Sequence, residues 1–239
     1  MHYVQNTEAD RRQMLDTIGV DSVDDLMQVI PEDCRFREDL DIGPALTEDE
    51  VFRHMRTIAA KNVSAADHPS FLGAGVYHHF CPALVENLVS RTEYWTAYTP
   101  YQPEASQGTL TTIYEFQTQM CRLTGMEVSN ASVYDGATAV VESVLLALKA
   151  RPKATRVLAS AGLHPDALAC LRTYLRHIDI EVVEVPLADG RTDPAAVTGE
   201  DVGAVAFQTP NFYGVVEDTA ALSDKAHELG GLSIVATDP

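Results

Sequence analysis

The chain has 239 residues, of which 46% are hydrophobic and 22% charged, so it can bury a sizeable core. A formal net charge of −18 argues against a nucleic-acid partner or an anionic membrane surface, because each requires a basic stripe. No stretch approaches the roughly 20 apolar residues of a membrane span. Residues 1–6 lack the basic and apolar regions of a signal peptide. We therefore expect a cytoplasmic protein.

The acidic charge comes with few lysines, since only four accompany 35 acidic residues. Such a halophile-like surface is typical of proteins that stay dissolved in concentrated salt, although an ordinary acidic enzyme can have the same composition. Of these two alternatives we favour a salt-adapted host.

Neither the cysteines nor the histidines predict a metal site. The four cysteines form no CxxC pair and lie about forty residues apart, so we expect them to be small core residues (Cys34, Cys81, Cys121 and Cys170). The adjacent His78 and His79 would point to opposite faces of a strand, and no third ligand is spaced near them.

The first sixty residues predict three helices that together form an N-terminal arm over residues 1–62. The first runs from its cap at Thr7 to Ile18, and the second spans 23–30 before Pro31. A capping box, TEDE at 47–50, opens the third helix over 51–60. Its apolar positions keep helical spacing, which predicts packing on a larger body through one face (Val51, Met55, Ile58 and Ala59).

Two longer helices follow. The first begins at Thr109 and ends at Gly125, with apolar and amide side chains at helical spacing (Leu110, Ile113, Tyr114, Gln117, Met120 and Cys121). The second spans 137–150 and ends before Pro152. We expect core packing to account for both stripes.

Strands and helices then alternate to the end of the chain. The expected strands are 156–160, 180–185, 202–208 and 232–237, and the expected helices are 165–177 and 219–229. This order predicts βαβ units and a mostly parallel sheet. Ligands of such sheets bind at the carboxyl ends of the strands, and polar residues follow three of them here (His164, Asn211 and Asp238).

The loop from Asn130 to Thr138 precedes a helix whose first turn is Gly-Ala-Thr. Free N–H groups at such a helix start suit a phosphate, and a small first turn lets it approach closely. The alternative is that Asn130, Ser132 and Asp135 are ordinary turn and N-cap residues that only start the helix.

The loop belongs to a set of long, irregular, glycine-punctuated strings. These include FLGAGVYHH at 71–79, CPA at 81–83, SRTEYWTAYTPYQ at 90–102, HPDAL at 164–168 and QTPNFYGVVED at 208–218. With residues 98–142 they resemble the first subunit of the two-subunit glycine dehydrogenase (decarboxylating), the P-protein of the glycine cleavage system. The resemblance covers nearly the whole chain.

The resemblance implies an α/β, fold-type I pyridoxal-phosphate-enzyme-like large domain over residues 63–239. That domain would be incomplete, because first subunits of this family are nearly twice as long. The cofactor, pyridoxal phosphate, would be held by a lysine of the second subunit. None of this chain's lysines suits that task, so we expect no covalently held cofactor and no catalytic residue here (Lys61, Lys149, Lys153 and Lys225).

The resemblance also suggests site residues. His164 matches a histidine that stacks on the pyridine ring, and Asp238 matches an aspartate that pairs with the ring nitrogen, although both also suit helix caps. The pocket or relic candidates are Asn130, Ser132, Asp135, Gly136, Ala137, Thr138, His164 and Asp238. A second group could contact substrate or pack at an interface (Tyr94, Tyr98, Tyr101, Gln107 and Gly108).

The implied reaction decarboxylates glycine and passes its aminomethyl carbon to the lipoyl group of the H-protein. The implied enzyme, glycine dehydrogenase (aminomethyl-transferring, decarboxylating), would be a heterotetramer with two copies of each subunit, and the helical arm would wrap onto the partner. One alternative is a truncated, non-catalytic interaction fragment of that subunit. An independent aminotransferase is disfavoured by the lysine argument.

Overall fold

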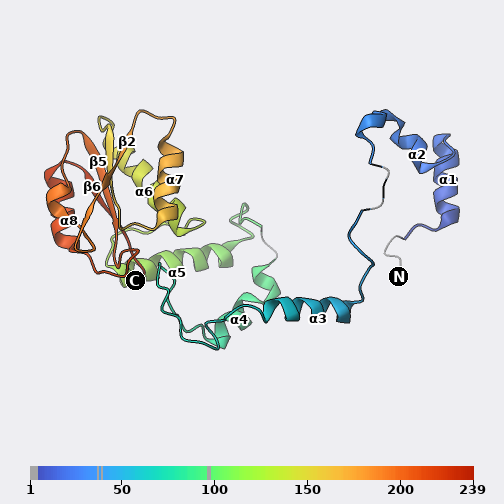
Figure 1. Cartoon of the computed structure of the whole chain (residues 1–239), viewed down its shortest axis with the longest axis horizontal. Coiled ribbons are helices and arrows are strands. Elements are labelled where there is room, and N and C mark those ends of the chain that lie inside the picture. Colours follow the sequence, from blue (N-terminus) through green and yellow to red (C-terminus); the bar gives the residue numbers. More distant parts are fainter. Residues whose placement is uncertain (1–4, 37, 39, 96–97) are drawn as a thin grey trace. The chain divides into compact units, whose positions relative to one another are not determined.

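The computed structural model describes residues 5–36, 38, 40–95 and 98–239. By its internal contacts the chain divides into two compact units, Met1–Ser64 and Ala65–Pro239, which we call the N-terminal and C-terminal units (Figure 1). The predicted division into a helical arm over residues 1–62 and an incomplete α/β domain over residues 63–239 stays a prediction.

The N-terminal unit contains the three predicted helices. They are α1 (Glu8–Ile18), α2 (Val23–Leu26) and α3 (Glu48–Ala59), and each begins with a capping box. The second helix is shorter than predicted: it continues as a 3-10 turn, η1 (Met27–Val29), and a further turn, η2 (Glu32–Cys34), follows Pro31. A helix as short as α2 gains little stability from the helix propensity of its residues, and its last turn tightens into a 3-10 turn.

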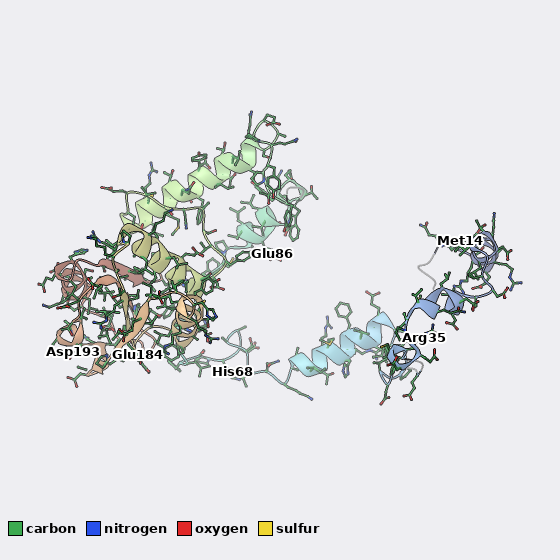
Figure 2. The ribbon with its side chains drawn as sticks, turned by 90° about the horizontal axis from the view of Figure 1, so that it is seen from above. Met14, Arg35, His68, Glu86, Glu184 and Asp193 are labelled. Atoms are coloured by element: carbon green, nitrogen blue, oxygen red, sulfur yellow. The ribbon has the colours of Figure 1, made fainter. Side chains whose placement is uncertain are left out.

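Apolar side chains of the N-terminal unit are largely exposed. No described residue of this unit is buried. On α3, Val51, Met55 and Ile58 keep 44%, 56% and 43% of their surface, and Met14 on α1 stands clear of its own helix (Figure 2). The N-terminal unit itself therefore does not cover the apolar face of α3. The packing of this face on a larger body stays a prediction.

The C-terminal unit is built on a four-stranded parallel sheet, as predicted. Its strands are β1 (Arg156–Ser160), β2 (Glu181–Val185), β5 (Val202–Gln208) and β6 (Leu232–Ala236), in the order β2-β1-β5-β6. The helices α6 (Gly136–Ala150) and α7 (Pro165–Leu175) cover one face, and α8 (Thr219–Glu228) covers the other (Figure 1). The predicted element order is confirmed, with ends that differ by at most two residues.

Alternation along the strands divides the core between the two faces. In β1 and β5, Val157, Ala159 and Ala204 pack with α6 and α7, whereas Leu158 and Phe207 pack with α8. Within β5, Gly203 permits close packing, because a Cβ there would lie 2.9 Å from both Leu148 Cδ2 and Ala154 Cβ. The two central strands, β1 and β5, are thereby packed between a core on each face of the sheet.

The apolar stripe of α5 (Gln107–Thr124) is not part of this core. Five of its six predicted positions are half-buried and Tyr114 keeps 71% of its surface, but none is buried and none belongs to either core cluster. The expectation of core packing is therefore wrong for α5 within this chain. It is correct for α6, where Val140, Val141 and Val144 are buried. The physical reason is that α6, α7 and α8 already cover the two faces of the sheet.

The cysteine expectation is also wrong for three of the four residues. Cys34 and Cys81 are exposed, and Cys121 is half-buried on α5, outside the two cores. Cys170 is also half-buried, but it packs against the core between the sheet and helices α6 and α7, so the expectation holds in part for Cys170 alone. Among the described residues, no group of three or more His, Cys, Asp or Glu could hold a metal ion.

Several short elements were not predicted. They are α4 (Ala83–Val89), the 3-10 turns η3 (Thr92–Tyr94) and η4 (Pro194–Ala196), and an antiparallel hairpin of β3 (Leu187–Ala188) and β4 (Arg191–Thr192). Residues 76–82 form no strand, so His78 and His79 do not have the strand geometry assumed for them. No helix in the described ranges is long and apolar enough to cross a membrane.

Candidate functional site

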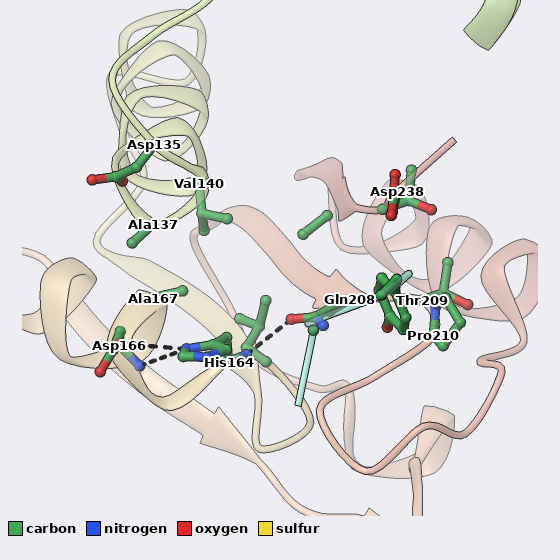
Figure 3. A pocket seen from close by; sticks show the side chains of 16 residues that line it. Asp135, Ala137, Val140, His164, Asp166, Ala167, Gln208, Thr209, Pro210 and Asp238 are labelled. Atoms are coloured by element: carbon green, nitrogen blue, oxygen red, sulfur yellow. Dashed lines mark hydrogen bonds and ion pairs between the residues drawn. The ribbon is translucent and has the colours of Figure 1, made fainter. Parts of the chain in front are cut away.

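A cavity of about 550 Å³ lies at the carboxyl ends of β5 and β6, where a parallel sheet is expected to bind its ligand. It is lined by the first turns of α6 and α7, by residues that follow β5 and β6, and by Gly75 and Tyr77. We call it the strand-end cavity. Figure 3 shows Asp135 and Asp238 on opposite sides of it, with His164 and Gln208 between.

His164 lies at the start of α7 and lines this cavity. Its Nδ1 accepts a hydrogen bond from the backbone N of Asp166 at 3.1 Å, and its own backbone N donates to Gln208 Oε1 at 3.0 Å. The edge of the ring meets Phe212, with centroids 5.2 Å apart and planes at 89°. The imidazole is therefore fixed as a helix cap, and its remaining nitrogen, Nε2, has no hydrogen bond within the described chain.

Asp135 is the N-cap of α6. Its Oδ1 accepts hydrogen bonds from the backbone N of Thr138 at 2.7 Å and from Thr138 Oγ1 at 2.9 Å. These bonds, the backbone bond foremost, lower the pKa of Asp135 below its usual value, so its carboxylate is ionised at neutral pH. The start of this helix thus carries a negative charge and has at least one of its N–H donors already paired.

Asp238 follows β6 and lines the cavity on the other side. Its Oδ2 lies 2.7 Å from Nε2 of His79, a residue 159 positions earlier in the chain. The contact is partly exposed, with 40% of the Asp238 side chain and 68% of the His79 side chain accessible. His79 is a site residue that sequence reasoning missed, because nothing local to residue 79 signals its partner.

The remaining predicted residues do not all meet at this cavity. Asn130, Ser132 and Thr138 line a separate groove of about 1090 Å³ beside α5 and α6, while Asp135 and Gly136 border both spaces. Asn130 Oδ1 accepts from the backbone N of Ser132 at 3.1 Å. The predicted rim lies on exposed positions and lines neither space, so its contact role stays a prediction (Tyr94, Tyr98, Tyr101, Gln107 and Gly108).

A buried polar network underlies the loop that follows β5. Four polar or charged residues are buried in the described chain, and all four belong to it (Ser160, Thr192, Asn211 and Glu217). Glu217 Oε1 accepts from Thr192 Oγ1 and from Asn211 Nδ2, each at 2.9 Å, and Glu217 Oε2 accepts from the backbone N of Thr192 at 2.9 Å. Thr192 Oγ1 also lies 2.6 Å from Ser160 Oγ.

This network holds the loop that packs against His164, which lines the cavity. Asn211 Oδ1 accepts from the backbone N of Tyr213 and of Val215, each at 3.1 Å, and the backbone N of Phe212 donates to Gly162 O at 2.8 Å. Phe212 is thereby held against His164. Only Asn211 had been singled out among these residues; the others are single polar side chains within or beside apolar runs, which is a weak signal.

The strand-end cavity does not fit the cofactor that the resemblance implies. Pyridoxal phosphate needs a lysine for its Schiff base, and no lysine is among the described residues that line the cavity. Its phosphate would meet the ionised Asp135 at the start of α6, and its ring nitrogen would find the Asp238 carboxylate already paired with His79. All three departures concern groups that bind the cofactor directly.

The family model of the glycine cleavage system P-protein matches residues 1–239. The probable glycine dehydrogenase (decarboxylating) subunit 1 of Geobacillus kaustophilus is 48% identical over 99% of this chain and 53% of that relative. A crystal structure of glycine decarboxylase (P-protein) of the glycine cleavage system, in inhibitor-bound form, is 43% identical with a TM-score of 0.80. The match covers 100% of this chain and 54% of the chain in that crystal structure.

A more distant structure supports the fold alone. The Oryza sativa TDC structure with PLP and tryptamine is 14% identical with a TM-score of 0.58, and covers 98% of this chain and 56% of that chain. The α/β architecture is therefore that of fold-type I pyridoxal-phosphate enzymes. The chain spans about half the length of the curated relatives it matches. Because the match runs from its first residue to its last, the chain belongs to the glycine cleavage system P-protein family.

Proposed function

We propose that this chain is part of subunit 1 of a glycine dehydrogenase (decarboxylating) and that it acts without a cofactor of its own. The observation that supports the second half of this proposal is that Asp135 and Asp238, on the two sides of the strand-end cavity, are hydrogen-bonded within the chain, and that no lysine is among the described residues that line it. Lys149 lies in the last turn of α6, and Lys225 pairs with Glu228 on α8 at 2.6 Å. Pyridoxal phosphate and its lysine therefore belong, on this proposal, to the second subunit.

The partners follow from the same proposal. The assembled enzyme would decarboxylate glycine and pass the aminomethyl carbon to the lipoylated H-protein, in the cytoplasm, as a heterotetramer with two copies of each subunit. This chain would contribute surface that shapes the complex. The supporting observation is its uncovered apolar surface, which includes Phe71 at 95% and Phe80 at 90% exposure.

The complex can be tested directly. We expect the protein, expressed from its own gene with the second subunit, to co-purify with that subunit. The pair should exchange the carboxyl carbon of glycine with CO₂ in the presence of H-protein, and neither subunit should do so alone. A second subunit that is fully active by itself would contradict the proposal.

The alternative is a non-catalytic interaction fragment. It is compatible with the share of the relatives that the chain spans, 53%. In that case residues 1–239 would bind the second subunit and produce no exchange, whereas a version extended to the length of its relatives would restore it. The two outcomes separate binding from turnover.

The cofactor assignment makes a separate prediction. Incubation of the chain with pyridoxal phosphate should give no stoichiometric Schiff base, because none of its lysines lies in the cavity. Borohydride reduction followed by mass spectrometry measures this. Complete labelling of one specific lysine would refute the assignment, whereas scattered, substoichiometric labelling of surface lysines would agree with it.

Gly136 offers a test of whether the loop before α6 faces the shared site. A Cβ built at Gly136 meets nothing within 4 Å, so Gly136→Leu should leave the melting midpoint of the chain nearly unchanged. In the assembled enzyme we expect exchange to fall about tenfold or more if the loop touches something outside the chain, because small misplacements are costly in catalysis. Ala220→Leu, in the first turn of α8, is the matched control. Unchanged kinetics with an intact complex would mean that the loop only starts the helix.

A further inference from the structure

On each side of the strand-end cavity a carboxylate is hydrogen-bonded within the chain itself. On one side, Asp135 occupies an N–H donor of α6 with its own carboxylate. On the other side, Asp238 is paired with His79. A ligand that used these two sides would have to share the Asp238 carboxylate with His79 and approach α6 beside the Asp135 carboxylate.

The charge of the cavity also opposes an anionic ligand. Three aspartates line it, namely Asp135, Asp166 and Asp238, and no lysine or arginine lines it within the part of the chain that the structure describes. A phosphate brought to the start of α6 would lie beside the Asp135 carboxylate, where like charges repel and the benefit of the helix dipole is offset. The cavity therefore differs in its charge from a phosphate-binding site.

The segment that carries His79 also lines the cavity. Gly75 and Tyr77 line it, and a Cβ built on Gly75 would lie 3.8 Å from Cδ2 of His164. Gly75 has a φ of +79°, which favours glycine and lets the backbone run close to the imidazole. We call residues 75–79 the strap. The His79–Asp238 contact joins its far end to the residue that follows β6.

We propose that the strap and Asp135 occupy the two positions that a phosphorylated pyridine would use in this cavity. The His79 imidazole contacts Asp238 where the ring N–H of such a ligand would bind, and the Asp135 carboxylate caps α6 where its phosphate would bind. The chain thereby excludes phosphorylated pyridines from this cavity. This exclusion is a separate property from the lack of a lysine that would hold such a ligand covalently. This inference concerns the cavity of the chain itself and does not depend on the proposed complex. Its test measures ligand binding and not enzyme activity, so the two proposals can fail separately.

The test uses pyridoxine 5′-phosphate, which has no aldehyde and so reports non-covalent binding alone. Asp135→Asn removes the charge but leaves an oxygen that can cap α6, and His79→Ala frees Asp238. Titration calorimetry on the full chain should show no saturable binding to the unaltered protein. The double variant should bind at least about tenfold more tightly than the unaltered protein, because one repulsive charge is removed and one acceptor is released.

The matched control is Asp193→Asn with His78→Ala. Asp193 caps the η4 turn through Ala195 N and does not line the cavity, and His78 is the neighbour of His79 without its contact. This control should bind no better than the unaltered chain. Saturable binding to the unaltered chain, or a test variant that binds no better than the control, would overturn the proposal. If the double variant fails to fold, Asp135→Asn alone decides, with the same direction expected.

Discussion

Replacing Glu217 with alanine should lower the free energy of unfolding by about 3 kcal/mol, because three buried donor groups lose one acceptor and one of them has no other. The donors are the backbone N and Oγ1 of Thr192 and Nδ2 of Asn211. The amide of Asn211 keeps a second acceptor, Gly190 O at 2.8 Å, and the Thr192 hydroxyl can still pair with Ser160. The backbone N of Thr192 keeps no acceptor, so most of the cost arises there.

Urea unfolding of the chain measures this loss. Glu217→Gln should cost less than Glu217→Ala, because one side-chain oxygen remains to accept a hydrogen bond. Glu228→Ala is the control, since it removes an exposed carboxylate whose pair with Lys225 should contribute at most about 1 kcal/mol. A loss below about 1 kcal/mol for Glu217→Ala would mean that the network rearranges or admits water, and that it does not hold the loop beside His164.

The elements that could be predicted are those with a local signal. The strands at residues 156–160 and 202–208 are apolar runs between turn residues, and the bounds predicted for both agree with the structure at each end. Asp135 and Gly125 act as the helix caps that their residue types favour. The positions of polar groups at strand ends also followed from topology, since parallel strands present their carboxyl ends at one edge.

What could not be predicted depends on contacts between distant residues. The His79–Asp238 pair and the bond between Ser160 and Thr192 join segments with no shared local pattern. A helical stripe shows that one face is apolar, but it does not show what covers that face. This is why α5 and α6 looked alike in sequence, although only α6 has buried residues.

The melting midpoint of the chain should rise steeply with salt. With a formal charge of −18, the folded chain repels itself, and this repulsion is screened as the Debye length falls from roughly 10 Å at about 0.1 M to about 3 Å at 1 M. Salt also weakens ion pairs, but those of the described chain are at least partly exposed, for example Arg156–Glu181 and Arg91–Glu93, and each contributes little. A net gain of about 3 kcal/mol would raise the midpoint by roughly 10 °C.

A variant with fewer negative charges separates this screening from a general salting effect on apolar surface. Asp179→Asn, Glu200→Gln and Asp224→Asn together remove three exposed charges that have no hydrogen bond or ion pair within the described chain. If self-repulsion governs stability, the triple variant should melt higher than the unaltered chain at 0.1 M salt, and the difference should shrink toward 1 M as screening removes the advantage. Parallel curves would assign the rise to salting effects, because these act on both proteins equally. A midpoint that does not change with salt in the unaltered chain would remove the salt-adapted interpretation, and the acidic surface would then be that of an ordinary enzyme.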